Sequence, residues 1–126
     1  MKAKLIGYWT TTVIIALVLL SGGAAQLAHQ RDTIEGLAKL GYPPYFGTIL
    51  GTWKVLGGIA LLAPRFPLLK EWAYAGTFFD MTGAAASHAL SGDVGSYAFH
   101  VIMPLLFAAL TVASWALRPP GRALAA

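Results

Sequence analysis

The sequence predicts an all-α integral membrane protein, a four-helix bundle with a short amphipathic helix between its first and second membrane spans. Hydrophobic residues make up 57% of the 126 residues and charged residues only 11%, whereas about 25% of an ordinary soluble domain is charged. So little polar surface would not cover a soluble globule. Four apolar segments of about the 20 residues that a span needs form one predicted domain over residues 1–126, with spans at about 5–28, 46–63, 70–90 and 96–117.

The charge pattern and the missing cysteines exclude several classes of protein. The net charge is +4, but the basic residues occur singly at segment ends and form no basic stripe, so no nucleic-acid partner is expected. The chain has no cysteine, and it can therefore form neither a disulfide nor a thiolate metal site. Any redox role must use a bound cofactor or a partner subunit.

The first 28 residues admit two interpretations. Lys2 and Lys4 precede apolar residues 5–20 and small residues 21–25, an order that is typical of a secretory signal peptide. The apolar character continues to Ala28, however, which favours a first membrane helix. We therefore expect a span over about 5–28.

The polar stretch 31–40 is expected to form the short amphipathic helix. Its residues Ile34, Leu37 and Leu40 fall at roughly helical spacing among charged residues, as in a helix that lies at the membrane surface. Gly41 and the Pro43-Pro44 pair should end it.

The second and third spans are joined by the short turn 64–67 and must lie side by side. In the second span, Gly47 and Gly51 offer a small-residue face that permits close approach between helices. We favour intramolecular packing of this face over dimerisation, while a homo-oligomer stays a hypothesis. In the fourth span, Pro104 should bend the helix.

The basic residues predict the orientation in the membrane, because cytoplasmic loops carry an excess of Lys and Arg. With a cytoplasmic N-terminus, the outer side holds only Arg31 and Lys39. The inner side then holds six basic residues, Lys2, Lys4, Arg65, Lys70, Arg118 and Arg122. Both termini are therefore expected in the cytoplasm.

Each middle span carries one charged residue near its centre. Lys54 and Asp80 both lie roughly 14 Å along their helices from the turn, because an α-helix rises about 1.5 Å per residue, and this is near the middle of a hydrocarbon layer about 30 Å thick. An isolated charge at this depth costs about 2.5–3.5 kcal/mol, so we expect the two to pair. The pair is interpreted either as a ligand-binding element or as a structural ion pair that fixes helix register.

Further polar residues gather in the predicted outer half of the membrane. They are Gln26, His29, Ser87, His88 and His100, and as a set they predict an outer polar pocket that reaches from the ion pair to the surface, where the histidines could exchange protons. The histidines lie on three helices without the short paired spacing of a dedicated site, so a metal or haem is not expected. Most aromatic residues should lie in the core or at the interface, but Trp53 and Tyr74 are candidates to line the pocket and stack on a quinone ring.

Several segments together resemble the DoxX-like family of small bacterial membrane proteins. They are Gly41–Tyr45, Leu50–Gly58, Pro64–Gly76, Ser87-His88 and Gly92-Asp93. The resemblance implies a compact four-helix domain in the bacterial inner (cytoplasmic) membrane. The family name comes from a subunit associated with thiosulfate:quinone oxidoreduction, and some relatives are linked to oxidative-stress complexes. It implies no agreed catalytic residues.

The leading hypothesis is a membrane subunit that binds a quinone-like or other small amphipathic ligand between its helices and supports a redox partner subunit. A small oligomeric transporter or channel and a non-catalytic membrane scaffold are the alternatives. An autonomous enzyme is not expected, because the sequence contains no nucleotide-binding loop, no nucleophile–base motif and no metal motif. The lipid bilayer is the one partner that all three hypotheses share.

Overall fold

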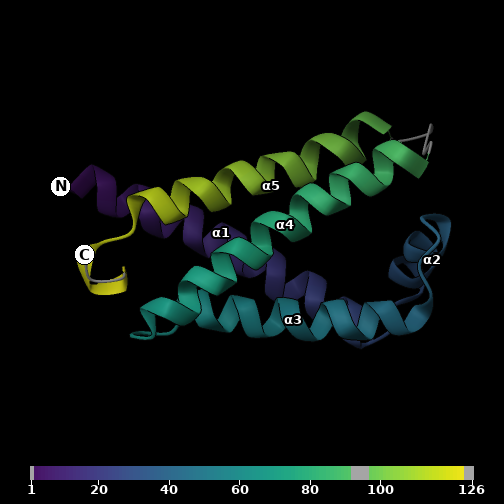
Figure 1. Ribbon diagram of the computed structural model, residues 1–126, viewed down its shortest axis with the longest axis horizontal. Coiled ribbons are helices and arrows are strands. Elements are labelled where there is room, and N and C mark those ends of the chain that lie inside the picture. Colours follow the sequence, from purple (N-terminus) through teal and green to yellow (C-terminus); the bar gives the residue numbers. More distant parts are fainter. Residues whose placement is uncertain (1, 92–96, 124–126) are drawn as a thin grey trace.

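The computed structural model describes residues 2–91 and 97–123, and within them the chain is helical without strands (Figure 1). Five α-helices and one 3-10 helix follow one another along the chain. Their bounds are α1 Lys2–Leu27, α2 Arg31–Lys39, α3 Pro44–Leu62, α4 Pro67–Ser91, α5 Tyr97–Leu117 and η1 Pro120–Arg122. The all-α prediction and the short helix between the first two long ones are confirmed.

The two middle helices begin earlier than the sequence analysis expected. Pro44 was expected to lie before the second span, and Pro67 in the turn before the third, but α3 starts at Pro44 and α4 at Pro67. Proline fits the first turn of a helix because the N–H groups there have no intrahelical acceptor and the proline φ is already helical. The expected start of the fourth span, Ser96, lies outside the described residues.

In the described part of the chain, three helices are long and apolar enough to cross a membrane: α1, α3 and residues Phe99–Leu117 of α5. The sequence analysis expected four such spans. The difference is α4, which has 25 residues but includes Lys70, Glu71, Asp80 and His88. By length and composition alone, α4 does not qualify as an independent span.

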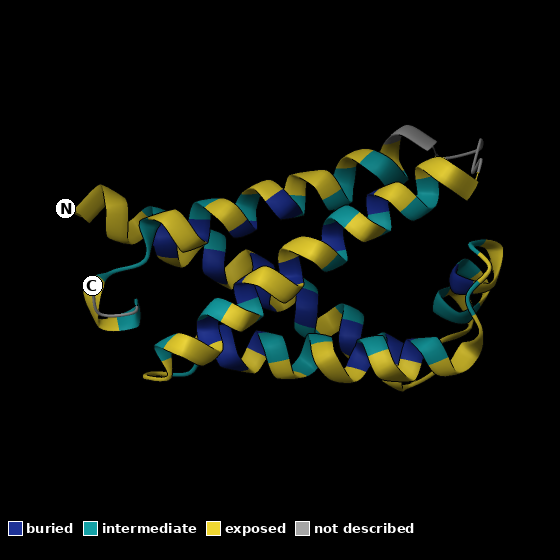
Figure 2. Cartoon of the chain, in the orientation of Figure 1, coloured by how far each residue is buried: buried dark blue, intermediate teal, exposed yellow. Residues whose placement is uncertain are grey.

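The long helices pack in a cyclic order in which one neighbouring pair diverges. α1 packs against α3 and α5, and α5 packs against α4, whereas α3 and α4 have fewer contacts than these pairs. Figure 1 shows why: α3 and α4 are close at their turn and separate toward the opposite end. The core contains Ile15, Leu19, Leu61, Tyr74, Met81 and Ala108, and Figure 2 shows exposed positions along the outer faces of all the long helices.

Glycines bring the backbones of α1 and α3 into contact. A Cβ atom at Gly51 would lie 2.8 Å from the carbonyl oxygen of Gly23, and a Cβ at Gly23 would lie 2.9 Å from that of Gly51. Gly47 instead faces α2, where a Cβ would lie 3.1 Å from Leu37 Cδ1. The small-residue face of α3 is thus used inside the chain.

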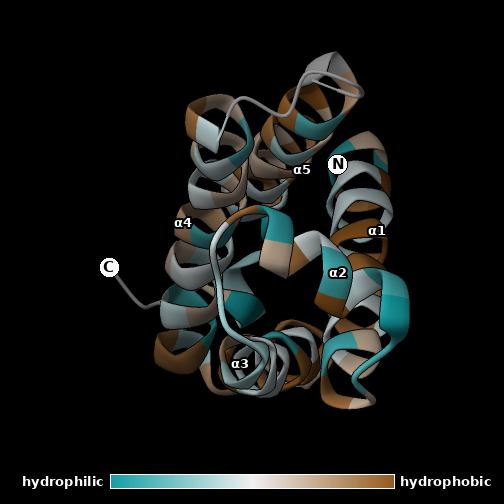
Figure 3. Cartoon of the chain, turned by 90° about the vertical axis from the view of Figure 1, so that its right-hand side faces the viewer, coloured by the Kyte–Doolittle hydropathy of each residue, from teal (hydrophilic) through white to brown (hydrophobic). Residues whose placement is uncertain are grey.

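Helix α2 lies at the opposite end of the molecule from η1 and the start of α1 (Figure 1). It contacts α3 and α1, and in the end view its hydrophilic residues lie across the ends of the long helices (Figure 3). The segment that follows α2 reaches α4, because the Tyr42 hydroxyl lies 2.7 Å from Ser87 Oγ. This hydrogen bond ties the C-terminal part of α4 to the α2–α3 connection.

The glycine contact generates a prediction about stability. Replacing Gly51 with Ala should lower the free energy of unfolding by about 1–3 kcal/mol, because the new methyl group would meet the backbone of α1. Gly83→Ala is the matched control, since a Cβ there meets nothing within 4 Å and alanine favours a helix. Denaturant unfolding in micelles, followed by circular dichroism, measures both. Equal stability of the two variants would contradict the contact.

Candidate functional site

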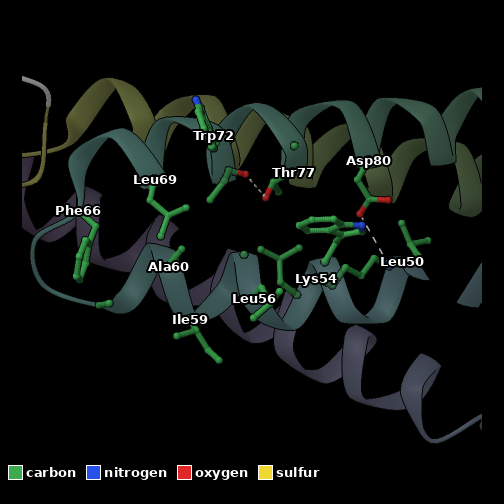
Figure 4. A pocket seen from close by; sticks show the side chains of 16 residues that line it. Leu50, Lys54, Leu56, Ile59, Ala60, Phe66, Leu69, Trp72, Thr77 and Asp80 are labelled. Carbon is green, nitrogen blue, oxygen red and sulfur yellow. Dashed lines mark hydrogen bonds and ion pairs between the residues drawn. The ribbon is translucent and has the colours of Figure 1, made fainter. Parts of the chain in front are cut away.

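A groove of about 600 Å³ lies between α3 and α4. We call it the α3–α4 groove, and Figure 4 shows Phe66 near one end and Lys54 with Asp80 near the other. Its walls are almost entirely apolar, and they include Leu50, Leu56, Ile59, Ala60, Phe66 and Leu69. The shape is that of a site for an elongated apolar molecule with one polar end.

The groove follows from the turn and from the small residues on the facing helices. The turn brings α3 and α4 together at one end, where Arg65 and Phe66 have φ values of 69° and 56°. Both values lie in the left-handed region that residues other than glycine seldom adopt. Beyond the turn, Gly57 on α3 and Gly76 on α4 line the groove, and a Cβ at Gly76 would meet nothing within 4 Å. The two helices therefore leave space between them.

The Lys54–Asp80 ion pair forms the polar end of the groove. Lys54 Nζ lies 3.9 Å from Asp80 Oδ2, and the two side chains are 18% and 17% exposed. The ammonium lies against α1 at a position without a side chain, since a Cβ at Gly22 would be 3.9 Å from Lys54 Nζ. At this separation the two groups attract each other but are too far apart for a hydrogen bond. Since neither side chain makes a hydrogen bond within the described residues, both can bind a polar group in the groove.

The groove is open along its side. Its lining includes Trp53, Phe66 and Trp72, which are 68%, 62% and 68% exposed. Exposed side chains of this size would form an unfavourable surface in water, but in a bilayer they face lipid chains. A ligand can therefore enter the groove sideways from the hydrocarbon layer.

Tyr74 does not line this groove, although it was expected to line the pocket with Trp53. It is buried, and its hydroxyl lies 2.8 Å from Ser114 Oγ of α5. It borders a smaller groove of about 260 Å³ between α4 and α5. The reason is helical geometry: Trp72 faces the α3–α4 groove, and a residue two positions later points to a different side of the helix.

The outer polar residues are also separate from the α3–α4 groove, because none of the five is among its lining residues. His29 Nε2 lies 3.0 Å from Thr48 Oγ1, Ser87 pairs with Tyr42, and the rings of His88 and His100 are 4.7 Å apart. Gln26 is buried, and its Oε1 has no hydrogen-bond partner in the described part of the chain. The predicted outer polar pocket therefore stays a prediction, and these residues are not part of the α3–α4 groove.

Within residues 2–91 and 97–123, no cluster of three or more His, Cys, Asp and Glu side chains could hold a metal ion. The groups that could contact a cofactor are those of the α3–α4 groove. Its ammonium and carboxylate can bind carbonyl, hydroxyl or similar polar groups, and its exposed indoles can contact a planar ring. This arrangement is suited to bind a molecule with a polar group and to orient that group.

Sequence analysis missed the role of Lys70, which it counted as a charge at the inner end. Its side chain is buried, and Nζ donates hydrogen bonds of 2.8 Å to the carbonyl oxygens of Ala60 and Arg65 and a further one to that of Ala63. These carbonyls belong to the last turn of α3 and the residues after it, where backbone acceptors have no intrahelical donor. The one available signal was a lysine one turn into the helix that follows a short turn.

Comparison with known proteins identifies one family. A model of the DoxX-like family matches residues 10–114, which include α3, α4 and the whole α3–α4 groove. No curated protein and no solved structure matches the chain.

The ion pair generates a prediction. Asp80→Asn leaves the Lys54 ammonium without a counter-charge, so we expect the free energy of unfolding to fall by about 3 kcal/mol. The double variant Lys54→Met/Asp80→Asn should lose less than the sum of the two single variants, because each single change leaves one charge unpaired. Unfolding in micelles measures all three variants.

The exposed pair Arg31–Glu35 supplies the control. Its side chains are 89% and 58% exposed, so Glu35→Gln should change the free energy of unfolding by less than about 1 kcal/mol. Additive losses for Lys54 and Asp80 would show that the two charges do not interact.

Proposed function

The chain belongs to the DoxX-like family, and from this membership and the geometry of the α3–α4 groove we propose that it holds a quinone-like or other small amphipathic molecule between α3 and α4 in the membrane. One observation carries the proposal. A charge pair without a hydrogen bond between its members ends a long apolar groove.

The proposed ligand places its polar group at the ion pair. An oxygen atom of the ligand accepts a hydrogen bond from the Lys54 ammonium, and a hydroxyl, where the ligand has one, donates to the Asp80 carboxylate. Charge-assisted hydrogen bonds of this kind are strong where little water competes. The apolar part lies along Leu56, Ile59 and Leu69 toward the turn, where burial of hydrocarbon adds to affinity.

The proposal includes a four-helix membrane bundle in which α4 is the third of four spans. Its charged residues have partners inside the chain: Asp80 pairs with Lys54, Glu71 lies 2.8 Å from Arg118 Nη2, and Lys70 donates to carbonyls of α3 and the turn. Ionisable residues in membrane helices are tolerated when they are paired in this way. Thus α4 can span as part of the bundle although it would not do so alone.

The proposed orientation has both termini in the cytoplasm of a bacterial inner membrane. The start of α1 and η1 lie at one end of the molecule, together with the α3–α4 turn (Figure 1). This end carries the six basic residues that were assigned to the inner side, which supports the orientation. The α3–α4 groove then lies in the cytoplasmic half of the bilayer.

The proposed redox role is indirect. The chain has no cysteine, so it has no thiol with which to exchange electrons. In our proposal it presents the bound molecule to a redox partner subunit, in keeping with the associations of the family.

Binding can be tested with decylubiquinone, which quenches tryptophan fluorescence on contact. Trp53 and Trp72 line the groove, so purified protein in lipid nanodiscs should show saturable quenching. Gly76→Phe places a ring in the open part of the groove and should weaken binding by at least about tenfold, or about 1.4 kcal/mol.

The matched control is Gly83→Phe. Gly83 is also on α4, and a Cβ added there would likewise meet nothing within 4 Å. It does not line the groove, so quenching should stay as in the unchanged protein. Quenching that is linear in decylubiquinone concentration, or equally weakened in both variants, would contradict the proposal. Either result would favour the alternative hypothesis of a non-catalytic membrane scaffold in which the ion pair has a structural role.

A further inference from the structure

The segment after α5 crosses back over the end of the bundle and is held there by Arg122. We call residues 118–123 the tail. Arg122 Nε donates a 2.6 Å hydrogen bond to the Tyr8 hydroxyl of α1, and the guanidinium carbon lies 4.8 Å from the centre of the Trp9 ring. The tail is thereby fixed to the first turns of α1.

The same guanidinium also binds the end of α3. Arg122 Nη2 lies 2.9–3.0 Å from the carbonyl oxygens of Leu61, Leu62 and Ala63. These acceptors have no donor within the helix, and they carry the negative end of its dipole. One side chain therefore joins the tail, α1 and the last turn of α3.

A second cation approaches this turn from the other side. Lys70, at the start of α4, donates to the carbonyl oxygens of Ala60 and Ala63, and the Ala63 carbonyl accepts from both Lys70 and Arg122. The last turn of α3 is thus bound by two cations, from α4 and from the tail, in addition to the packing of Leu61 in the core.

These contacts lie directly behind the α3–α4 groove. Ala60 and Ala63 line the groove, whereas Arg122 and the rest of the tail do not. Because α3 and α4 pack less extensively than the other adjacent long helices, few apolar contacts are available to set their separation. The cation–carbonyl bonds are well placed to set it instead.

We propose that Arg122 is a positioning residue that sets the width of the α3–α4 groove at its turn end, so that the tail controls ligand affinity without touching the ligand. This inference rests on the proposed function where affinity is concerned, but the effect on groove width does not. With Arg122 bound, the last turn of α3 is drawn onto α1 and faces Lys70. When Arg122 is released, Lys70 alone holds that turn, and α3 and α4 can move apart.

Groove width can be measured directly, since the chain has no cysteine of its own. Spin labels at Ile59→Cys and Leu69→Cys stand one on each wall of the groove. Pulsed electron–electron double resonance in nanodiscs reports the distance between the two labels. We expect Arg122→Gln to broaden the distance distribution and shift it to longer values. Arg118→Gln is the matched control, because Arg118 pairs with Glu71 and Trp115 and makes no hydrogen bond or ion pair with α3 in the described part of the chain.

A milder variant keeps the inference testable if Arg122→Gln fails to fold. Tyr8→Phe keeps the ring in the core and removes the hydroxyl that accepts from Arg122 Nε, while the contacts of Arg122 with the end of α3 remain possible. It should shift the distance in the same direction by a smaller amount. Arg122→Lys should give a distance between those of the unchanged protein and Arg122→Gln, because an ammonium cannot reproduce the forked contacts of a guanidinium.

Binding of decylubiquinone gives the second readout. Arg122→Gln should weaken saturable quenching about tenfold, which corresponds to about 1.4 kcal/mol, whereas Arg118→Gln should leave it unchanged. An unchanged distance distribution in both Arg122→Gln and Tyr8→Phe would overturn the inference, whatever the binding result. Absence of quinone binding in the unchanged protein, together with a shifted distance in Arg122→Gln, would instead reject the proposed ligand class and support the role of the tail.

Discussion

The backbone contact between α1 and α3 determines where the other features of the molecule can lie. Gly23 and Gly51 let the two helices approach until a single added methyl group would meet a carbonyl oxygen. One face of α3 is therefore committed to α1, while α4 packs mainly on α5. The short turn still ties α3 to α4 at one end, so the two helices diverge from it. The α3–α4 groove results because α3 packs on α1 and α4 packs on α5 while the turn joins the two helices. The same packing places Lys54 against Gly22.

The charged residues of α4 all have partners on other segments, which explains how so polar a helix packs among the apolar ones. Each of its three charged residues meets a different neighbour: Lys70 the end of α3, Glu71 the end of α5, and Asp80 the middle of α3. In the proposed four-span bundle, where α4 would be surrounded by little water, such contacts would be needed and also specific, because a shift in register would leave charges unpaired. The polar residues that make α4 a poor independent span thus give it one preferred position among the other helices.

Composition and spacing were enough to predict the helical class, the short helix between the first two long ones and the approach of Lys54 to Asp80. The packing details could not be predicted in the same way. The position of Tyr74 depends on which side of α4 faces α5, and only three-dimensional packing decides this. Lys70 and Arg122 were counted only as basic residues of the inner side, because most of their acceptors are backbone carbonyls, which leave no mark in a sequence.

Among the described residues, the Lys54–Asp80 and Arg118–Glu71 ion pairs differ in a way that bears on function. Arg118 lies 2.8 Å from Glu71, and the indole of Trp115 donates a 2.9 Å hydrogen bond to the other carboxylate oxygen. Glu71 is thus fully engaged, as a structural contact requires. Lys54 and Asp80 are 3.9 Å apart and face a cavity, although closer contact would lower their energy if they served packing alone. The wider pair is the one whose geometry leaves room for a third polar group, and it is the one that ends the groove.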